Sequence, residues 1–241
     1  VLECTGAFTS TEKASLHLNA GAKKVLISAP GKDEMLTIVN GVNDDKLTGS
    51  ETVVSASSCT TNCLAPLLKI IEDNFGIEKG FMSTVHAYTA DQNAMDNMHK
   101  KGISSRRGRA SAHNIVPTST GAAKSIGLVI PSLKGKLDGI AYRVPTIDGS
   151  MIDVTLELKF PVTKELINET IKNNQNDAIK YTEDPIVSSD VIGKKRGCTF
   201  DSLLTNIIEV EGKQLVKLVG WYDNEYGYTY QMLCTAKKMF K

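Results

Sequence analysis

The chain changes from strand to helix within ETVVSASSCTTNCLAPLLKIIEDNFG, residues 51–76. Thr52 to Ser55 is a short run rich in β-branched residues, which predicts a buried strand. Further along, apolar residues recur at spacings of three and four until Gly76, which predicts a helix with one apolar face, made of Leu64, Leu67, Leu68, Ile71 and Phe75. The Ser and Thr side chains at its start suit N-capping. Cys59 therefore lies where a strand becomes a helix.

The residues before this junction alternate short apolar runs with turns. Lys23 to Ser28 predicts a second buried strand, and Ile38 to Val42 is a candidate for a third. A helix is predicted from Glu12 to Ala20. Strands that alternate with a helix are typical of an α/β fold, and we expect this part to belong to a parallel, doubly wound sheet.

The residues after Cys59 have a different pattern. Helices are predicted from Thr118 to Leu128, from Thr163 to Ala178 and from Glu225 to Phe240. Ile152 to Phe160 has period two, which predicts one strand face. An antiparallel hairpin is predicted across residues 207–221, with its turn at 211–212. These residues indicate an α+β domain with a mixed or antiparallel sheet, and we place the change between the two parts near Ser58.

The composition argues against several classes of protein. The 241 residues include 28 basic and 27 acidic side chains, so the net charge does not indicate binding to nucleic acid or to a membrane surface. No apolar run approaches the roughly 20 residues that span a bilayer. The cysteines, at positions 4, 59, 63, 198 and 234, fit neither a zinc pattern nor a disulfide scaffold, which predicts a reduced, cytoplasmic protein without a metal site. The chain starts with Val1 and without signal-peptide features, and we expect that it begins inside a longer protein.

Cys59 is a candidate nucleophile because of its place at a helix start. A thiol attacks a carbonyl as its thiolate, and helix-start amides, neighbouring hydroxyls or a histidine would each lower its pKa. The same amides could hold a developing oxyanion. A buried, unreactive thiol is the simpler interpretation of the other cysteines. Cys63 lies four residues beyond Cys59 on the same helix face, which would permit oxidative pairing, although a structural disulfide is not expected.

Three other segments could complete a site around Cys59. His86 ends an apolar run that opens into a loop, where catalytic groups are often placed, although a single histidine is more often structural. The hydroxyl-rich run from Pro117 to Lys124 is either a phosphate site at a helix start or a capping sequence. Arg143 lies among apolar residues and needs an anionic partner, either a protein carboxylate or a substrate phosphate. The basic loop from Arg106 to Arg109 is interpreted as solvated or as a subunit contact.

Five segments together resemble the glyceraldehyde-3-phosphate dehydrogenase family, in family order and over nearly the whole chain. They are SSCTTNCLAP (57–66), VHAYT (85–89), PTSTGAAK (117–124), RVPT (143–146) and WYDNEYGY (221–228). The resemblance implies a phosphorylating, NAD-dependent oxidoreductase of glycolysis. Such an enzyme is a homotetramer that converts glyceraldehyde 3-phosphate, NAD and inorganic phosphate to 1,3-bisphosphoglycerate and NADH through a cysteine thioester.

The resemblance also implies roles for single residues in catalysis and phosphate binding. Cys59 would attack the aldehyde, and His86 would raise the thiolate fraction and then accept the hydroxyl proton as hydride leaves for the nicotinamide. Thr89 and Arg143 would hold the substrate's own phosphate. The attacking phosphate would be held by Ser58, Thr60, Thr120 and Gly121.

The cofactor site and the domains follow from the same resemblance. Asn224 would bond the nicotinamide carboxamide, and three residues match family positions near the cofactor, namely Thr5, Gly6 and Ser28. Residues 1–58 would be the remaining part of a dinucleotide-binding domain, joined by a C-terminal helix at 222–241. Residues 59–221 would form the catalytic domain.

The chain departs from the family pattern in its cofactor-binding part. It contains no G-x-G-x-x-G turn, and roughly the first 80 to 90 residues of a typical family chain have no counterpart. The acidic residue that would separate NAD from NADP is also absent. The segment from His99 to Arg109 is longer than the usual family loop, which normally lies at a subunit interface. Two alternatives therefore accompany the main prediction: an inactive or non-catalytic fragment of such an enzyme, and an erythrose-4-phosphate dehydrogenase using the same Cys and His.

Overall fold

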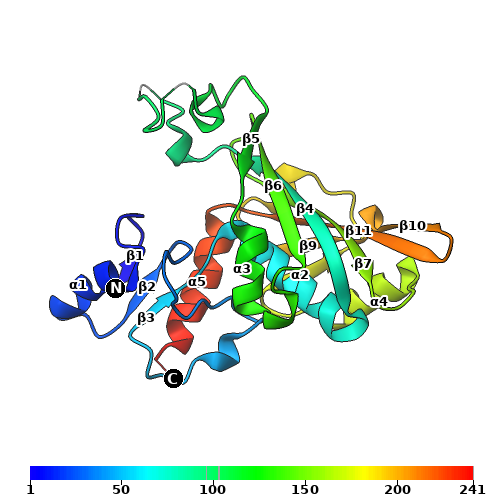
Figure 1. Ribbon diagram of the computed structural model, residues 1–241, viewed down its shortest axis with the longest axis horizontal. Coiled ribbons are helices and arrows are strands. Elements are labelled where there is room, and N and C mark those ends of the chain that lie inside the picture. Colours follow the sequence, from blue (N-terminus) through cyan, green and yellow to red (C-terminus); the bar gives the residue numbers. More distant parts are fainter. Residues whose placement is uncertain (96, 103, 241) are drawn as a thin grey trace.

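The fold contains two β-sheets, a small parallel one and a large mixed one (Figure 1). It is described by a computed structural model for residues 1–95, 97–102 and 104–240. The small sheet has three strands in the order β1-β2-β3. The large sheet has eight strands in the order β5-β6-β4-β7-β11-β9-β8, with β10 paired to β11. No helix in the described part of the chain is long and apolar enough to cross a membrane.

The small sheet consists of β1 (Leu2–Glu3), β2 (Val25–Ile27) and β3 (Val53–Ser55), with α1 (Thr11–Asn19) between the first two. The predictions for β2, β3 and α1 are confirmed. The third strand expected at Ile38 to Val42 is wrong, because only Thr37 forms a β-bridge, to Ser55. The Asn43 side chain instead accepts the Val39 N–H (2.9 Å) and donates to the Thr37 carbonyl (2.9 Å), which satisfies these backbone groups without a strand partner.

Helix α2 (Cys59–Phe75) begins and ends where its sequence pattern predicts. The Ser58 hydroxyl caps it by accepting the Thr61 N–H at 3.2 Å, and Gly76 ends it with φ of 65°. Its apolar face lies in the largest core cluster together with the inward residues of β7 and β11. Cys59, the first residue of this helix, is therefore held in place by a helix whose apolar face is buried in the core.

The large sheet is built mainly from antiparallel pairs. Its strands are β4 (Ile77–Ala87), β5 (Val116–Ser119), β6 (Leu137–Val144), β7 (Ser150–Leu158), β8 (Ile179–Thr182), β9 (Cys198–Asp201), β10 (Asn206–Val210) and β11 (Lys213–Tyr222). Only the pairs β4–β6 and β8–β9 are parallel. The period-two prediction for β7 is confirmed at Ile152, Val154 and Leu156, which are fully buried. It is wrong at Phe160, which follows the strand and is exposed.

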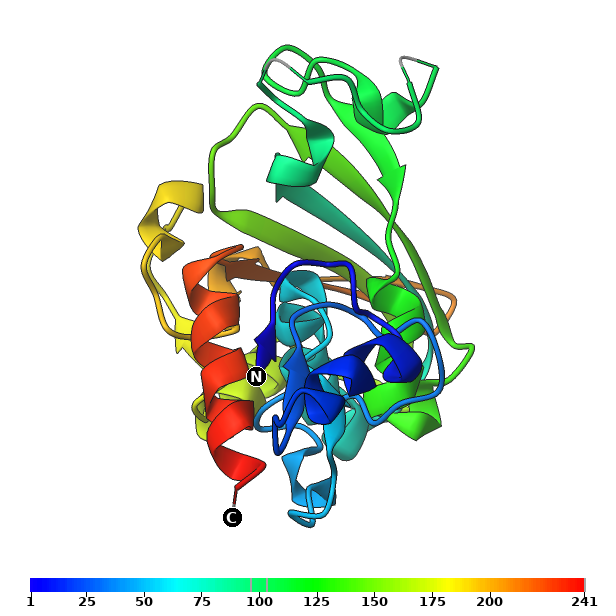
Figure 2. The ribbon, with the colours of Figure 1, turned by 90° about the vertical axis from the view of Figure 1, so that its left-hand side faces the viewer.

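Helices α2, α3 (Ala122–Val129) and α4 (Lys164–Asn173) pack on one side of the large sheet, as Figure 2 shows. The helix predicted from Thr118 begins only at Ala122, because Thr118 and Ser119 pair with β6 in strand β5. Thr163 caps α4 as predicted, but the helix stops at Asn173. It stops early because the Asn176 side chain accepts the N–H groups of residues 178 and 179 and turns the chain into β8.

The C-terminal part returns to the small sheet. The predicted hairpin of β10 and β11 is confirmed, and Glu211 and Gly212 have φ of 51° and 73°, the left-handed values that a type I′ turn needs. Helix α5 (Tyr226–Lys238) then packs Met232 on the small-sheet residues Leu26 and Val54, as the C-terminal helix was expected to do. The domain limits 1–58, 59–221 and 222–241 stay a prediction, and Lys241 lies outside the described residues.

Short 3-10 helices complete the chain, at Asp44–Lys46, Ala90–Gln92, Arg106–Gly108, Pro131–Leu133, Ser188–Val191 and Ser202–Leu204. The described part of the segment between β4 and β5 extends away from both sheets (Figures 1 and 2). It contains the loop that sequence assigned to a solvated or subunit-contact role.

The core role of α2 predicts the effect of truncating its apolar face. Leu68→Ala removes a side chain with no exposed surface, and we expect a loss of about 2–5 kcal/mol in the free energy of unfolding, from lost transfer energy and the cavity left behind. Leu128→Ala, in α3, removes a side chain that is 61% exposed and serves as the control. Urea unfolding of both variants measures the difference, and equal losses would show that α2 is not the centre of the core.

Candidate active site

Cys59 is the first residue of α2 and is half-buried. Two residues earlier, Ser57 is buried and has φ of 60°, which is uncommon for a residue with a side chain. Its N–H is held by the Ser55 hydroxyl at 3.0 Å. Such a backbone conformation costs free energy and persists only where the surroundings fix it. The bend at Ser57 turns the chain sharply from β3 into α2 and directs Cys59 to the edge where β4 ends.

His86 is the second-to-last residue of strand β4, before Ala87, and is buried. Its Nε2 atom is 3.6 Å from the Cys59 sulphur. The Thr60 hydroxyl is 3.9 Å from the same sulphur. A proton can therefore pass between the thiol and the imidazole without a large movement, which is the geometry expected of a nucleophile and its base.

Three groups surround Nδ1 on the other side of the His86 ring. They are the Ala87 carbonyl at 2.6 Å, Arg143 Nη1 at 3.1 Å and Asn224 Nδ2 at 3.1 Å. The Asn224 amide is oriented by Ser150, whose hydroxyl accepts the Ala87 N–H (2.9 Å) and donates to Asn224 Oδ1 (2.8 Å). These contacts at Nδ1 hold the imidazole ring in place, so that Nε2 faces the Cys59 sulphur.

Electrostatics favour a neutral His86. Burial, followed by the positive charge of Arg143, lowers the pKa of His86 to about 4. Burial also raises the pKa of the Cys59 thiol, against the Thr60 hydroxyl and Arg143, which lower it. Arg143 rather than a charged histidine therefore supplies the positive charge that favours the thiolate. A neutral imidazole is the form that can accept a proton.

Arg143 ends β6 beside the site and offers unused donors. Its Nη1 atom donates to the Thr89 hydroxyl at 3.0 Å, and its Nε atom is buried without a hydrogen-bond partner in the described structure. Among the described residues it forms no ion pair, since nearby Asp91 is paired with Arg107. The sequence left two partners open for Arg143, a protein carboxylate or a substrate phosphate. No carboxylate among the described residues pairs with it, so the guanidinium is free to bind an anion.

The residues expected at the second phosphate site are already engaged in local bonds. Ser58 caps α2, and the Thr60 hydroxyl is 2.9 Å from the Tyr222 hydroxyl. Thr120 accepts the Ala122 N–H at 3.2 Å, and Gly121 is the N-cap of α3. The structure records no hydrogen bond between these last two residues and Cys59 or His86. The 117–124 run does precede α3, with Gly121 as its N-cap, and its Thr118 hydroxyl is buried without a partner in the described residues; the phosphate site at this helix start stays a prediction.

The residues expected near the cofactor lie at the carboxyl edge of the small sheet. Thr5 and Gly6 follow β1, and Ser28 follows β2. The Thr5 N–H and hydroxyl both donate to the Glu3 carboxylate, and Gly6 has φ of 73°. Parallel doubly wound sheets bind their ligands at this edge. Asn224 lies apart from these three residues, at the His86 side of the site.

Tyr222 and Ser150 also belong to the site, although the sequence interpretation gave them no role. The buried Tyr222 hydroxyl lies 2.9 Å from the Thr60 hydroxyl and 2.8 Å from the Thr84 hydroxyl, and its ring meets His86 edge-on. A signal in the sequence could have found both residues, because each falls at an alternate position of its strand, on the face that points into the core. A Tyr or Ser among inward apolar residues needs a buried hydrogen-bond partner.

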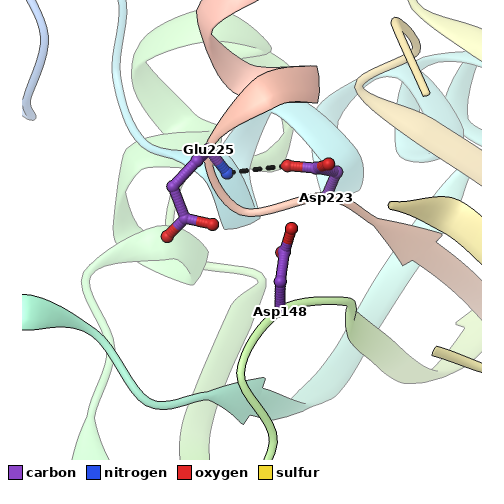
Figure 3. Close-up of side chains that lie close together, drawn as sticks. All are labelled: Asp148, Asp223 and Glu225. Atoms are coloured by element: carbon purple, nitrogen blue, oxygen red, sulfur yellow. Dashed lines mark hydrogen bonds between the residues drawn. The ribbon is translucent and has the colours of Figure 1, made fainter. Parts of the chain in front are cut away.

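Three carboxylates, Asp148, Asp223 and Glu225, lie close together (Figure 3). Asp148 accepts the Asn224 N–H at 3.0 Å, and Asp223 accepts the Glu225 N–H at 2.9 Å. Burial, then the negative charges of Asp148 and Asp223, raise the pKa of Glu225 to about 7. The cluster therefore holds the turn that carries Asn224, and Glu225 changes charge near neutral pH.

The lowered pKa of His86 predicts a loss of stability in acid. Between pH 6.5 and about 4 the unfolded state binds a proton at this residue that the folded state does not, so stability falls as pH falls through that window. We expect wild type to lose up to about 3 kcal/mol more than His86→Asn between pH 7 and 4.5. Urea unfolding at both pH values tests this, and equal losses would contradict it.

The raised pKa of Glu225 predicts the opposite dependence of folding stability on pH. Because its folded pKa is raised, the folded state binds the extra proton between pH 4.5 and about 7, and the contribution of Glu225 to stability is lost as pH rises through that window. We expect Glu225→Gln to be more stable than wild type at pH 8, with the gain vanishing below pH 4.5. Melting temperatures at the two pH values measure it, with the exposed Glu209→Gln as control. A gain independent of pH would refute the assignment.

The comparisons with known proteins agree with this geometry. The family described as glyceraldehyde 3-phosphate dehydrogenase, C-terminal domain, matches residues 58–224. Glyceraldehyde-3-phosphate dehydrogenase of Clostridium pasteurianum is 56% identical over 241 residues, which is all of this chain and 72% of that protein. The enzymes of Clostridium acetobutylicum (56% over 235 residues, 98% of this chain and 70% of that protein) and Streptococcus pyogenes (54% over 242 residues, 100% and 72%) are also similar. The chain belongs to the glyceraldehyde-3-phosphate dehydrogenase family.

Proposed function

We propose that the protein oxidises and phosphorylates glyceraldehyde 3-phosphate, with Cys59 as nucleophile and His86 as base. The observation that carries this is the 3.6 Å contact between Cys59 Sγ and His86 Nε2, beside an arginine that has no carboxylate partner among the described residues. Family membership supports the reaction type, a phosphorylating aldehyde dehydrogenase of glycolysis.

The first half of the reaction uses the thiol and the imidazole. The Cys59 sulphur bonds to the aldehyde carbon, and the carbonyl oxygen becomes the hydroxyl of a hemithioacetal. His86 Nε2 then accepts that hydroxyl proton while the carbon loses hydride, which leaves a thioester on Cys59. A neutral His86 suits this step, because an imidazole already protonated could not accept the proton. Bound NAD would supply the hydride acceptor.

The second half uses inorganic phosphate. A phosphate oxygen attacks the thioester carbon, the bond to sulphur breaks, and the thiolate leaves as an acyl phosphate forms. Thr89 and Arg143 hold the substrate's own phosphate, which the free Nε donor of Arg143 supports. The attacking phosphate is assigned to Ser58, Thr60, Thr120 and Gly121, with the start of α3 contributing its backbone N–H groups.

The chain's own residues fit a nicotinamide cofactor at the edge of the small sheet. Thr5, Gly6 and Ser28 lie where three parallel strands end, and Gly6 carries no side chain to obstruct a ligand. Asn224 lies beside His86, where its amide would orient the nicotinamide carboxamide. NAD binding measured by calorimetry separates this proposal from the alternative of a non-catalytic chain.

The partner and the compartment are further parts of the proposal. The side of the large sheet away from the helices exposes Phe81 (73%) and Leu215 (43%), which supports packing against a second copy, as in a homotetramer. A glycolytic role supports the cytoplasm. Sedimentation of the native protein tests the assembly.

Erythrose 4-phosphate remains the alternative substrate, and kcat/KM for the two aldehydes decides between them.

The mechanism predicts a sharp difference between two cysteine variants. Cys59→Ser removes the thiolate and should lower kcat by more than about 1000-fold, and His86→Asn should lower it by about 100- to 10,000-fold. Cys234→Ser, on α5, is the matched control and should keep wild-type activity. NADH formation with glyceraldehyde 3-phosphate and phosphate is the measurement. Substantial activity in Cys59→Ser would overturn the mechanism.

A further inference from the structure

Three cysteines follow one another from the site into the core. Cys59 is half-buried at the start of α2, and Cys63 lies one turn further along the same helix. Cys198 lies on β9, which packs beneath α2. Cys63 and Cys198 have no exposed surface, and the mechanism above uses neither of them. The first cysteine is open to small molecules and the other two are shielded.

Gly220, on β11, brings the two buried sulphurs together. A Cβ atom on Gly220 would lie 2.8 Å from the Cys198 sulphur and 3.2 Å from the Cys63 sulphur, so only glycine leaves space there. Both sulphurs flank the same point, which places them within about 6 Å of each other. After burial, the nearby Cys198 thiol is the largest cause that raises the pKa of Cys63.

The reactivity of the three thiols is unequal. A buried, protonated thiol reacts slowly with oxidants, because the thiolate is the nucleophile. Burial raises the pKa of the Cys59 thiol, and the Thr60 hydroxyl and the charge of Arg143 oppose that rise; Cys59 is also the one partly exposed thiol of the three. Helical side chains lean toward the N-terminus, so Cys63 lies under Cys59. Of the three thiols, Cys59 is therefore the one that an oxidant meets at the surface.

We propose that oxidation of Cys59 by a hydroperoxide is passed inward and ends as a Cys63–Cys198 disulfide, with Cys59 restored to its thiol. The peroxide oxygen first bonds to the Cys59 sulphur, which gives a sulfenic acid and an alcohol. Cys63 attacks that sulphur, and its proton leaves with the hydroxyl as water. Cys198 then attacks the Cys63 sulphur, and its proton goes to the departing Cys59 sulphur. Two electrons leave the buried pair, and the peroxide is reduced.

This end state protects the nucleophile. A sulfenic acid left on Cys59 can be oxidised further to an irreversible form. A bond between Cys63 and Cys59 would tie up the nucleophile at the start of α2, whereas a bond to Cys198 joins the helix to the sheet on which it already packs. The inference rests on Cys59 being the reactive thiol, but its test reads masses and needs no dehydrogenase activity.

Peptide mapping of the native protein tests the proposal. Tryptic cleavage puts Cys59 and Cys63 in residues 47–69 and Cys198 in residues 197–213. After limited hydrogen peroxide and alkylation with N-ethylmaleimide under denaturing conditions, these two peptides should be joined, with the alkyl group on Cys59. Thiol reductant should separate them. The proposal is overturned if Cys198 is alkylated while Cys59 is bonded to Cys63, or if Cys59 is over-oxidised while Cys63 and Cys198 are both alkylated.

Two variants sharpen the result. Cys198→Ser should stop at a Cys59–Cys63 bond or at further oxidation of Cys59, so alkylation of Cys59 after peroxide should fall several-fold below wild type. Cys59→Ser should abolish the joined peptides with peroxide, because the entry point is missing. A joined pair formed equally fast in Cys59→Ser would refute the inward transfer. The wild-type map decides the end product even if Cys198→Ser folds poorly.

Discussion

The contact between Cys59 Sγ and His86 Nε2 exists because α2 begins and β4 ends at the same edge of the molecule. Neither residue can reach the other from its own element alone. The bend at Ser57, with its positive φ, turns the chain out of β3 so that the first turn of α2 faces the end of β4. The apolar face of α2 then fixes the position of that turn, because it is buried in the core formed with β7 and β11. The chemistry at the surface depends on packing that lies beneath it.

Arg143 links the two halves of the site through its charge. Burial, followed by the charge of Arg143, keeps His86 neutral, and the same charge opposes the rise that burial causes in the pKa of Cys59. The Arg143 Nε donor is buried beside the site without a partner among the described residues. A substrate phosphate bound there would reduce the positive charge felt by both groups, so substrate binding and thiol reactivity are coupled. Burial, followed by that charge, accounts for a neutral imidazole beside a cysteine, where an ion pair is the usual expectation for a reactive thiol.

Local sequence patterns predicted the helix and strands that hold the site. Contacts between residues far apart in the sequence decided where some elements begin and which side chains meet. The capping residues and the spacing of apolar residues were sufficient to place α2 and therefore Cys59. They failed at Thr118, where pairing with β6 outweighed the helix-like run, and at Ile38, where the Asn43 side chain replaced a strand partner. Tyr222 was missed because its partners, Thr60 and Thr84, are far away in sequence and meet it only in the folded state. The resemblance identified Arg143, but its lack of a carboxylate partner within the described residues is visible only in three dimensions.

Helix α5 connects the small sheet to the base. Asn224, which contacts His86, is followed directly by α5, and that helix packs Met232 on Leu26 and Val54 of the small sheet. The Tyr228 hydroxyl also donates to the Ser57 carbonyl at 3.3 Å, at the bend before Cys59. A ligand at the carboxyl edge of the small sheet would thus lie against elements that position both the nucleophile and the base. Because Asn224 contacts His86 and Tyr228 contacts the bend at Ser57, a displacement of α5 would alter the surroundings of both the base and the nucleophile.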